Sequence, residues 1–117
     1  MKKTEIKIAG KKVNIAYCYA TEMNFTEIAG ISFEEYFNND KTNKHRGTAI
    51  LIMAAITAAY HDAEETPVTM TDILTSATPA ELVEASNKVM ELRTAWYAPE
   101  PDKKSKGKKQ KGDKEKN

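Results

Sequence analysis

Residues 49–60 read Ala-Ile-Leu-Ile-Met-Ala-Ala-Ile-Thr-Ala-Ala-Tyr, and Thr57 is the one member of this run that is neither apolar nor aromatic. A helix of this composition is hydrophobic on nearly every side, so other elements must cover it. Roughly twenty apolar residues are needed to span a bilayer, and this run stops well short of that at His61-Asp62. We therefore predict a central buried helix, with the rest of the chain packed around it, and no membrane span.

The N-terminal segment has a different period. Apolar and polar side chains alternate over residues 5–9 and again over residues 13–17, and Gly10-Lys11 lies between the two runs. Alternation with a period of two is typical of half-buried strands, and glycine can take the positive φ that a tight turn requires. These residues predict a β-hairpin with its turn at Gly10-Lys11 and one apolar face that lies against helices.

Two short helices are predicted between the hairpin and the central helix. From about Thr21 apolar residues fall three or four positions apart, and Gly30 closes the segment as a helix C-terminal glycine does. Ser32 and Glu35 have the spacing of a capping box, which starts a second helix of one or two turns. Residues 38–45 contain no aliphatic side chain, so they predict an exposed loop.

Two more helices are predicted after the central one. Pro67 ends the central helix region, because the residue before a proline is pushed out of the α conformation. Thr69 with Asp72 caps a short helix. Thr78-Pro79-Ala80-Glu81 combines an N-cap threonine, a proline at the first helical position and a glutamate that reaches back to the cap, so the last helix should span residues 79–97.

These elements predict a mainly α (α+β) fold, in which the N-terminal hairpin packs on a small bundle of about four to five helices. The chain has 117 residues, which is the size of one domain. We assign residues 1–98 to this domain and residues 99–117 to a disordered lysine-rich tail without hydrophobic side chains beyond its first prolines. Residues 103–117 hold eight lysines against Asp113 and Glu115, whereas the whole chain has a net charge of +1, so the body is mildly acidic.

Few residues are suited to catalysis or metal binding. The chain has two histidines, His45 and His61, and one cysteine, Cys18, and it contains no phosphate-binding or serine-nucleophile motif. His61 with the acidic residues after it reads as a solvated helix end, because no His-x-x-x-His spacing accompanies it. We expect a protein that is not an enzyme and has no cofactor or metal. A metal-assisted hydrolase is the contrary hypothesis, and it predicts zinc retained after purification.

The single cysteine and the N-terminal residues indicate in which cellular compartment the protein is expected. A single cysteine cannot form an internal disulfide, and no charged-then-apolar leader opens the sequence. We therefore expect a reducing cytoplasm.

The basic tail leaves a nucleic-acid hypothesis open. Each lysine that neutralises a phosphate releases a counterion, so the tail could bind DNA or RNA weakly and without sequence preference. It has no aromatic residue to stack on a base and no arginine to read one. The same tail would also serve as a solubilising extension or an interaction arm.

Soft apolar residues are abundant for so small a helical body. The chain has five methionines, whose flexible side chains fit irregular partners, and Trp96 and Tyr97 end the last predicted helix. Packing in the core is the alternative role for these side chains. As candidates for a protein-binding groove we select residues on the central and last helices: Met53, Tyr60, Met90, Trp96 and Tyr97.

The order of these elements resembles that of a known family. It comprises the hairpin, a tyrosine-bearing turn into a short helix, Gly30-Ile31-Ser32-Phe33-Glu34-Glu35, the segment "LIMAAITAAYHDAEETPVTMTDIL", and the last helix "TPAELVEASNKVMELRTAWY". Over residues 5–97 this pattern is similar to that of the tail assembly chaperones of long-tailed bacteriophages and gene transfer agents. The lysine-rich tail departs from the resemblance, since it is longer and more basic than the family pattern.

The resemblance implies a non-enzymatic protein of the bacterial host cytoplasm that is absent from the mature virion. Such a protein coats apolar stretches of the tape measure protein and helps tail tube protein subunits assemble around it. A long amphipathic client of this kind requires an adaptable apolar groove. Several copies along one client would gain from multivalency, so a homo-oligomer is compatible with this function.

Overall fold

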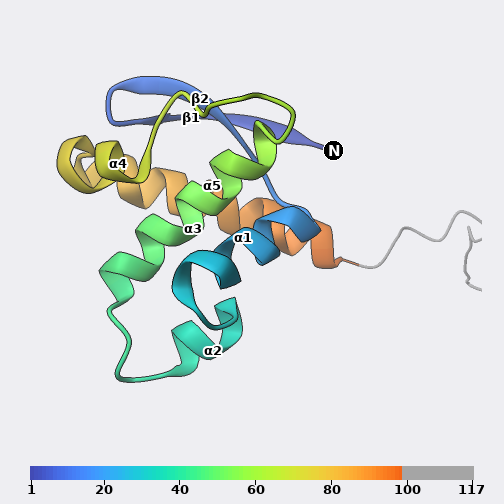
Figure 1. The fold of residues 1–117 in the computed structure, drawn as a ribbon, viewed down its shortest axis with the longest axis vertical. Coiled ribbons are helices and arrows are strands. Elements are labelled where there is room, and N and C mark those ends of the chain that lie inside the picture. The colour runs from blue at the N-terminus through green and yellow to red at the C-terminus, as the bar shows by residue number, and fades with distance from the viewer. Residues whose placement is uncertain (99–117) are drawn as a thin grey trace, which may run out of the picture.

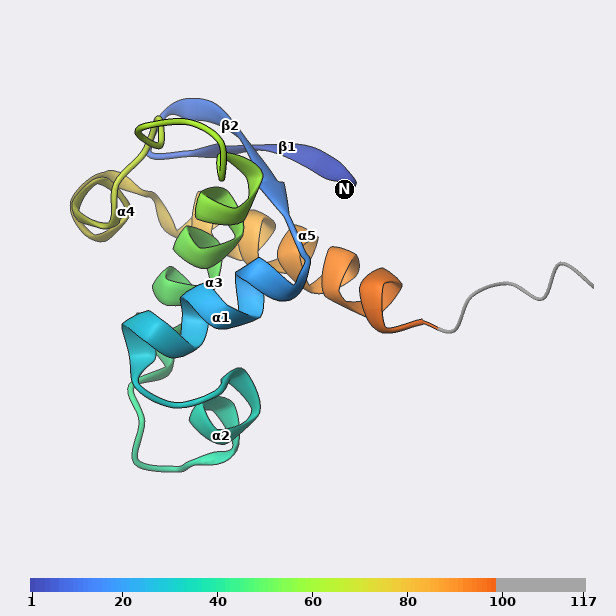
Figure 2. The same cartoon turned by 45° about the vertical axis from the view of Figure 1, so that its right-hand side comes forward.

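The computed structural model describes residues 1–98, in which a β-hairpin is followed by five helices (Figures 1 and 2). This order confirms the predicted fold class. The predicted tail, residues 99–117, lies outside the described residues. The elements are β1 (Lys3–Ile8), β2 (Lys11–Ala16), α1 (Tyr19–Ala29), α2 (Phe33–Asn38), α3 (Lys44–Ala59), α4 (Met70–Ser76) and α5 (Pro79–Tyr97).

The hairpin turn lies one residue earlier than predicted. The two strands are antiparallel, with Ile6 opposite Val13, and β2 already begins at Lys11. The central residues of the turn are Ala9 (φ 53°) and Gly10 (φ 78°). Two consecutive positive φ angles are characteristic of a type I′ turn, whose twist matches that of the strands it joins. The prediction of a turn at Gly10-Lys11 was therefore wrong by one position, because the positive φ falls on an alanine as well as on the glycine.

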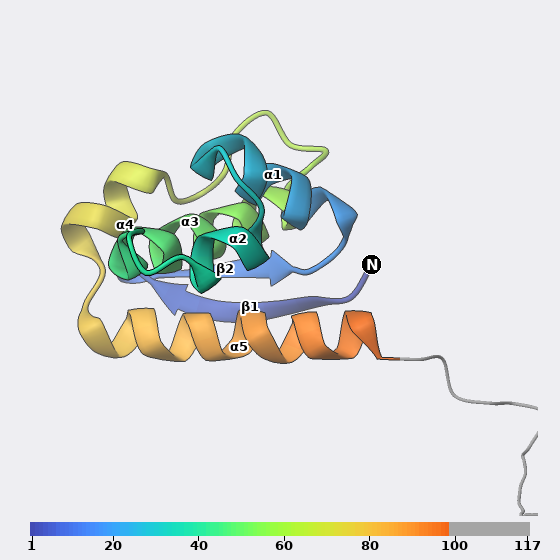
Figure 3. The same cartoon turned by 90° about the horizontal axis from the view of Figure 1, so that it is seen from below.

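The hairpin covers one side of the helices. Strand β1 lies along α5 and strand β2 packs against α3, as Figures 1 and 3 show. The isoleucines of both strands and Val13 point inward and are buried, whereas Lys3, Lys7 and Lys12 are exposed on the outer face. The alternation in the sequence thus separates a face that packs on helices from a face that meets water.

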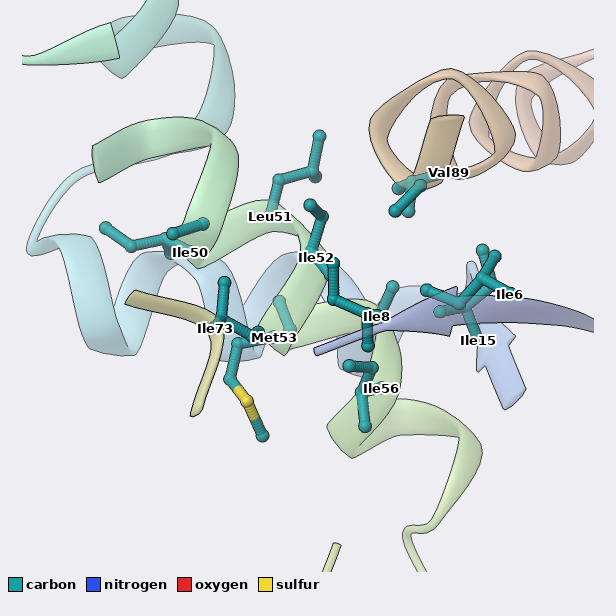
Figure 4. Close-up of a cluster of buried hydrophobic side chains, with 14 of the residues drawn as sticks. Ile6, Ile8, Ile15, Ile50, Leu51, Ile52, Met53, Ile56, Ile73 and Val89 are labelled. Atoms are coloured by element: carbon teal, nitrogen blue, oxygen red, sulfur yellow. The ribbon is translucent and has the colours of Figure 1, made fainter. Parts of the chain in front are cut away.

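Helix α3 is the centre of the core. Its residues from Ala49 to Ala59 are buried except Thr57, and the close-up in Figure 4 shows its isoleucines among side chains from both strands, α4 and α5. The helix begins at Lys44, five residues before the predicted apolar start. Asn43 is the reason, because its Oδ1 accepts hydrogen bonds from the backbone N–H groups of His45 (3.0 Å) and Arg46 (3.2 Å). The predicted loop 38–45 is correspondingly shorter.

The three predicted capping boxes are all present. Ser32 Oγ accepts from the backbone N–H of Glu35 (3.1 Å), Thr69 Oγ1 accepts from that of Asp72 (3.2 Å), and Thr78 Oγ1 accepts from that of Glu81 (3.2 Å). Each acidic side chain also accepts from the backbone N–H of its capping residue. These boxes fix where α2, α4 and α5 begin, so the lengths of the loops before them are fixed too.

The carboxylate of Glu81 additionally joins α5 to the hairpin. Its Oε1 accepts from the N–H of Ala9 and its Oε2 from the N–H of Gly10, both at 3.0 Å. The hydrogen bond from the Thr78 backbone, followed by that from Gly10, lowers the pKa of this carboxyl below its usual value. The hairpin turn is therefore held by a side chain from the first turn of α5, 72 residues after Ala9 in the sequence.

Candidate functional site

Helix α1 is amphipathic, and its start is fixed by Thr21. This threonine is fully buried, and its Oγ1 donates to the carbonyl of Ala16 (2.9 Å) while accepting from the N–H of Cys18 (3.1 Å). Phe25, one turn later, is buried against the rings of Phe33, Tyr36 and Phe37. With this side of α1 facing the core, the opposite side faces solvent.

Four large apolar or aromatic side chains are exposed on the first two turns of α1 and on the last turn of α5. Tyr19 and Met23 are four residues apart on α1, with exposed fractions of 68% and 54%. Trp96 and Tyr97 on α5 are exposed by 40% and 52%. Figure 3 shows α1 and α5 on opposite sides of the hairpin, and a hydrogen bond from the Tyr97 hydroxyl to Glu22 joins the end of α5 to the first turns of α1. We call these four residues the α1–α5 face.

Polar contacts link the two halves of the α1–α5 face. Glu22 Oε2 accepts a hydrogen bond from the Tyr17 hydroxyl (2.8 Å) and a second, short one from the Tyr97 hydroxyl. Trp96 lies between two aromatic neighbours, with ring centroids 5.6 Å from Tyr17 and 4.8 Å from Tyr97. Glu22 thus connects the exposed side of α1 to the aromatic end of α5.

Arg93 joins the C-terminal end of α5 to α2. Its guanidinium pairs with Glu34 at 2.6 Å and lies over the rings of Phe33 (4.4 Å to the centroid) and Tyr97 (4.8 Å). A bonded and stacked guanidinium positions its neighbours better than a free cation does. The last turn of α5 is therefore held in place although much of it is exposed.

Both tyrosines that bond Glu22 resist ionisation. Burial raises the pKa of Tyr17 above its ordinary value, and the hydrogen bond to Glu22 raises it further. For Tyr97 the hydrogen bond to Glu22 is the largest cause of its raised pKa. A carboxylate that accepts from a phenol favours the protonated phenol, so this network stays intact through the neutral pH range.

Two hollows flank this network. One of about 390 Å³ is lined by Tyr19, Glu22, Met23, Thr26 and Glu27 on α1. Another of about 280 Å³ is lined by Trp96, Leu92 and Ala95 of α5 together with Met1, Lys2, Tyr17 and Cys18. Both present apolar surface with a few polar groups, which suits a partner with apolar side chains and a polar rim.

The five predicted groove residues do not line one surface. Met53 is buried at 8% exposure beside Ile73 in the core (Figure 4), so its selection for a surface groove was wrong. Tyr60 is partly buried, and its hydroxyl accepts from the backbone N–H of Asn14 (3.1 Å). Met90 is partly exposed on α5, whereas Trp96 and Tyr97 belong to the α1–α5 face.

Sequence reasoning missed Tyr19 and Met23. The predicted helix began at about Thr21, and its apolar pattern was read from Phe25 and the apolar residues three and four positions after it. Tyr19 and Met23 are four residues apart, which is a helical spacing. This spacing places both side chains on the exposed side of α1 only once the opposite side is known to be buried.

The residues that the structure describes contain no cluster of metal ligands. Within residues 1–98, no cluster of three or more His, Cys, Asp or Glu side chains could hold a metal ion. Cys18 is a partly buried free thiol, 3.6 Å from the sulfur of Met1. His45 and His61 are exposed.

Within residues 1–98, no helix combines the length and the apolar character that crossing a membrane requires.

Comparison with known proteins does not extend this description. No family model matches the chain, and neither the curated proteins nor the solved structures gave a match. The function is therefore inferred from the exposed surface of the protein together with the resemblance of its sequence pattern.

Proposed function

We propose that this protein is a non-enzymatic tail assembly chaperone of a bacteriophage, and that its α1–α5 face binds apolar helical segments of a tape measure protein. The observation that carries this proposal is the exposure of Tyr19, Met23, Trp96 and Tyr97 together, next to a core that is already filled by other residues. Such a grouping of large apolar side chains on a small domain is typical of a binding surface.

The chemistry of the α1–α5 face suits an amphipathic helix. Apolar side chains spaced three and four apart on a client helix would enter the hollow that Glu22 lines and the neighbouring hollow beside Trp96. Methionine adapts to different shapes, and aromatic rings supply large contact areas at low entropic cost. A surface with these properties tolerates many similar segments, as a chaperone of a long repetitive client must.

The same proposal specifies the setting. The protein acts in the cytoplasm of the bacterial host, several copies bind along one tape measure, and tail tube protein subunits replace them, so that the chaperone is absent from the finished virion. Multiple weak contacts along one chain give high avidity without a large single interface.

Neighbouring genes give the first test. A tape measure gene directly downstream supports the proposal, and a position among unrelated metabolic genes contradicts it.

Co-expression gives the second test. The tape measure protein should stay soluble with the wild-type chaperone and precipitate with the double variant Tyr19→Ser, Met23→Ser. The control is Val83→Ser, which removes a side chain of similar exposure (61%) from another part of α5. Equal solubility with all three proteins would contradict the assignment of the α1–α5 face.

A nucleic-acid-binding adaptor is the second candidate, and the hairpin favours it. Lys3, Lys7 and Lys12 are exposed on the outer face of the sheet, and Lys7 lies directly opposite Lys12. Like charges in opposite positions cost stability, so an anionic partner would relieve them. In this case duplex DNA should bind at low salt and be released steeply as salt rises, and the variant Lys3→Glu, Lys12→Glu should bind DNA more weakly than the wild type does. Apolar docking at the α1–α5 face should instead survive added salt.

A further inference from the structure

We infer that the client segment recognised by the α1–α5 face is cationic, an amphipathic helix whose apolar stripe is bordered by lysine or arginine. This inference rests on the proposed function and specifies its partner. Its starting point is a sequence feature: residues 13–40 contain no lysine or arginine, but they contain Glu22, Glu27, Glu34, Glu35 and Asp40. That stretch includes the whole of α1 and α2.

The acidic residues stand where a client would border the apolar side chains. Glu22 and Glu27 line the same hollow as Tyr19 and Met23. Glu22 already accepts from two phenols, and both of these hydrogen bonds leave its charge uncompensated. Glu27 is exposed and forms no ion pair within residues 1–98. The hollow therefore combines apolar walls with two carboxylates and no cation among its lining residues.

The arginine near the end of α5 does not neutralise this hollow. Arg93 is bound to Glu34 and covered by the rings of Phe33 and Tyr97. None of the lysines of residues 1–98 lines this hollow: five lie in the hairpin segment 2–12, and one of these, Lys2, lines the neighbouring hollow beside Trp96. A client with acidic residues beside its apolar stripe would meet like charge here, whereas a client with basic residues would meet complementary charge.

The test uses the full chain and two synthetic helical peptides. Both carry the same Leu and Ala stripe and lack tryptophan, and their bordering positions are Lys in one and Glu in the other. Trp96, the single tryptophan of the chain, reports binding by fluorescence. At low salt we expect the Lys peptide to bind at least about tenfold more tightly than the Glu peptide, and this ratio should shrink as salt rises.

Two variants with the same net charge test whether the preference for the Lys peptide arises at the hollow on α1. Glu27→Lys should reduce the preference for the Lys peptide by about fivefold, whereas Glu84→Lys, an exposed change on α5, should alter it less than about twofold. Circular dichroism checks that both variants are folded. Equal affinity for the two peptides, or equal effects of the two variants, would overturn the cationic client but leave the proposed function standing. Failure of both peptides to bind would remove the proposed function and this inference with it.

Discussion

Helices α3 and α1 both carry a methionine, but the methionine of α3 is buried and that of α1 is exposed. Met53 on α3 is 8% exposed and Met23 on α1 is 54% exposed. The hairpin, α1, α4 and α5 all pack against α3, whereas the main neighbours of α1 are α3 and α2, on one side. The comparison shows that the elements packed around a helix, more than the type of residue, decide whether a methionine is buried in the core or exposed to solvent.

Truncation in α3 should give the largest loss of stability. Ile52 is fully buried, so Ile52→Ala leaves a cavity among the side chains of Figure 4. We expect the free energy of unfolding to fall by about 2–5 kcal/mol. Urea denaturation monitored by circular dichroism measures it. A loss below about 1 kcal/mol would mean that α3 is less tightly packed than the comparison assumes.

Gly47, in the first turns of α3, gives the next largest effect. An added Cβ would lie 2.5 Å from Cε1 of Tyr36 and 2.8 Å from Cζ of Phe37. Tyr36 cannot easily retreat, because it is buried and its hydroxyl donates to the carbonyl of Asn43 (2.7 Å). Gly47→Ala should therefore destabilise the protein by about 1–3 kcal/mol in urea denaturation, although alanine is the better helix former. Stabilisation would show that α2 is loosely held.

Tyr17 tests the polar network that supports the α1–α5 face. At pH 8 Tyr17→Phe should lower the free energy of unfolding by about 1 kcal/mol, since it removes the hydrogen bond to Glu22. Because the folded state raises the pKa of Tyr17, the phenol stays protonated there when the unfolded chain ionises near pH 10. The folded state then binds more protons, so the contribution of Tyr17 falls as pH rises above about 10.

The pH dependence is measured as the difference between wild type and Tyr17→Phe in urea denaturation from pH 8 to pH 11. This difference should narrow above pH 10. A constant difference over the whole range would contradict the raised pKa.

Substitutions on the exposed side of α1 should have the smallest effect on stability. Tyr19→Ser and Met23→Ser each remove a side chain that is more than half exposed, so the free energy of unfolding should change by about 0.5 kcal/mol or less. Thermal unfolding measures this change, and the co-expression assay measures binding by the same variants. A loss of stability comparable to that of Ile52→Ala would assign these residues to folding and remove the contrast between α1 and α3.

The fold could be predicted to a large extent because its boundaries are encoded locally. Thr78, Pro79 and Glu81 fixed the start of α5, and Gly30, with φ 87°, marks the end of α1. Local patterns failed where a boundary lacks an apolar period. Residues 44–48 are polar or small, so the first turns of α3 were hidden, and an alanine at positive φ moved the hairpin turn by one residue.

The candidate site could be predicted only in part because it depends on long-range packing. Trp96 and Tyr97 were found from their position at the end of the last helix. Met53 was misplaced, since a helix covered on all sides gives no sign of which methionine reaches the surface. Glu22 acquires its role from Tyr97, 75 residues away, and no pattern within α1 reports that contact.

The carboxylate of Glu81 has a consequence for synthesis on the ribosome. It closes the hairpin turn across 72 residues, so the turn lacks this partner while the intervening chain is still being translated. At about 5–20 residues per second the delay is roughly 4–14 s. During that interval the nascent hairpin has neither its carboxylate nor the helix that covers β1, so its apolar face is accessible to other proteins until α5 emerges.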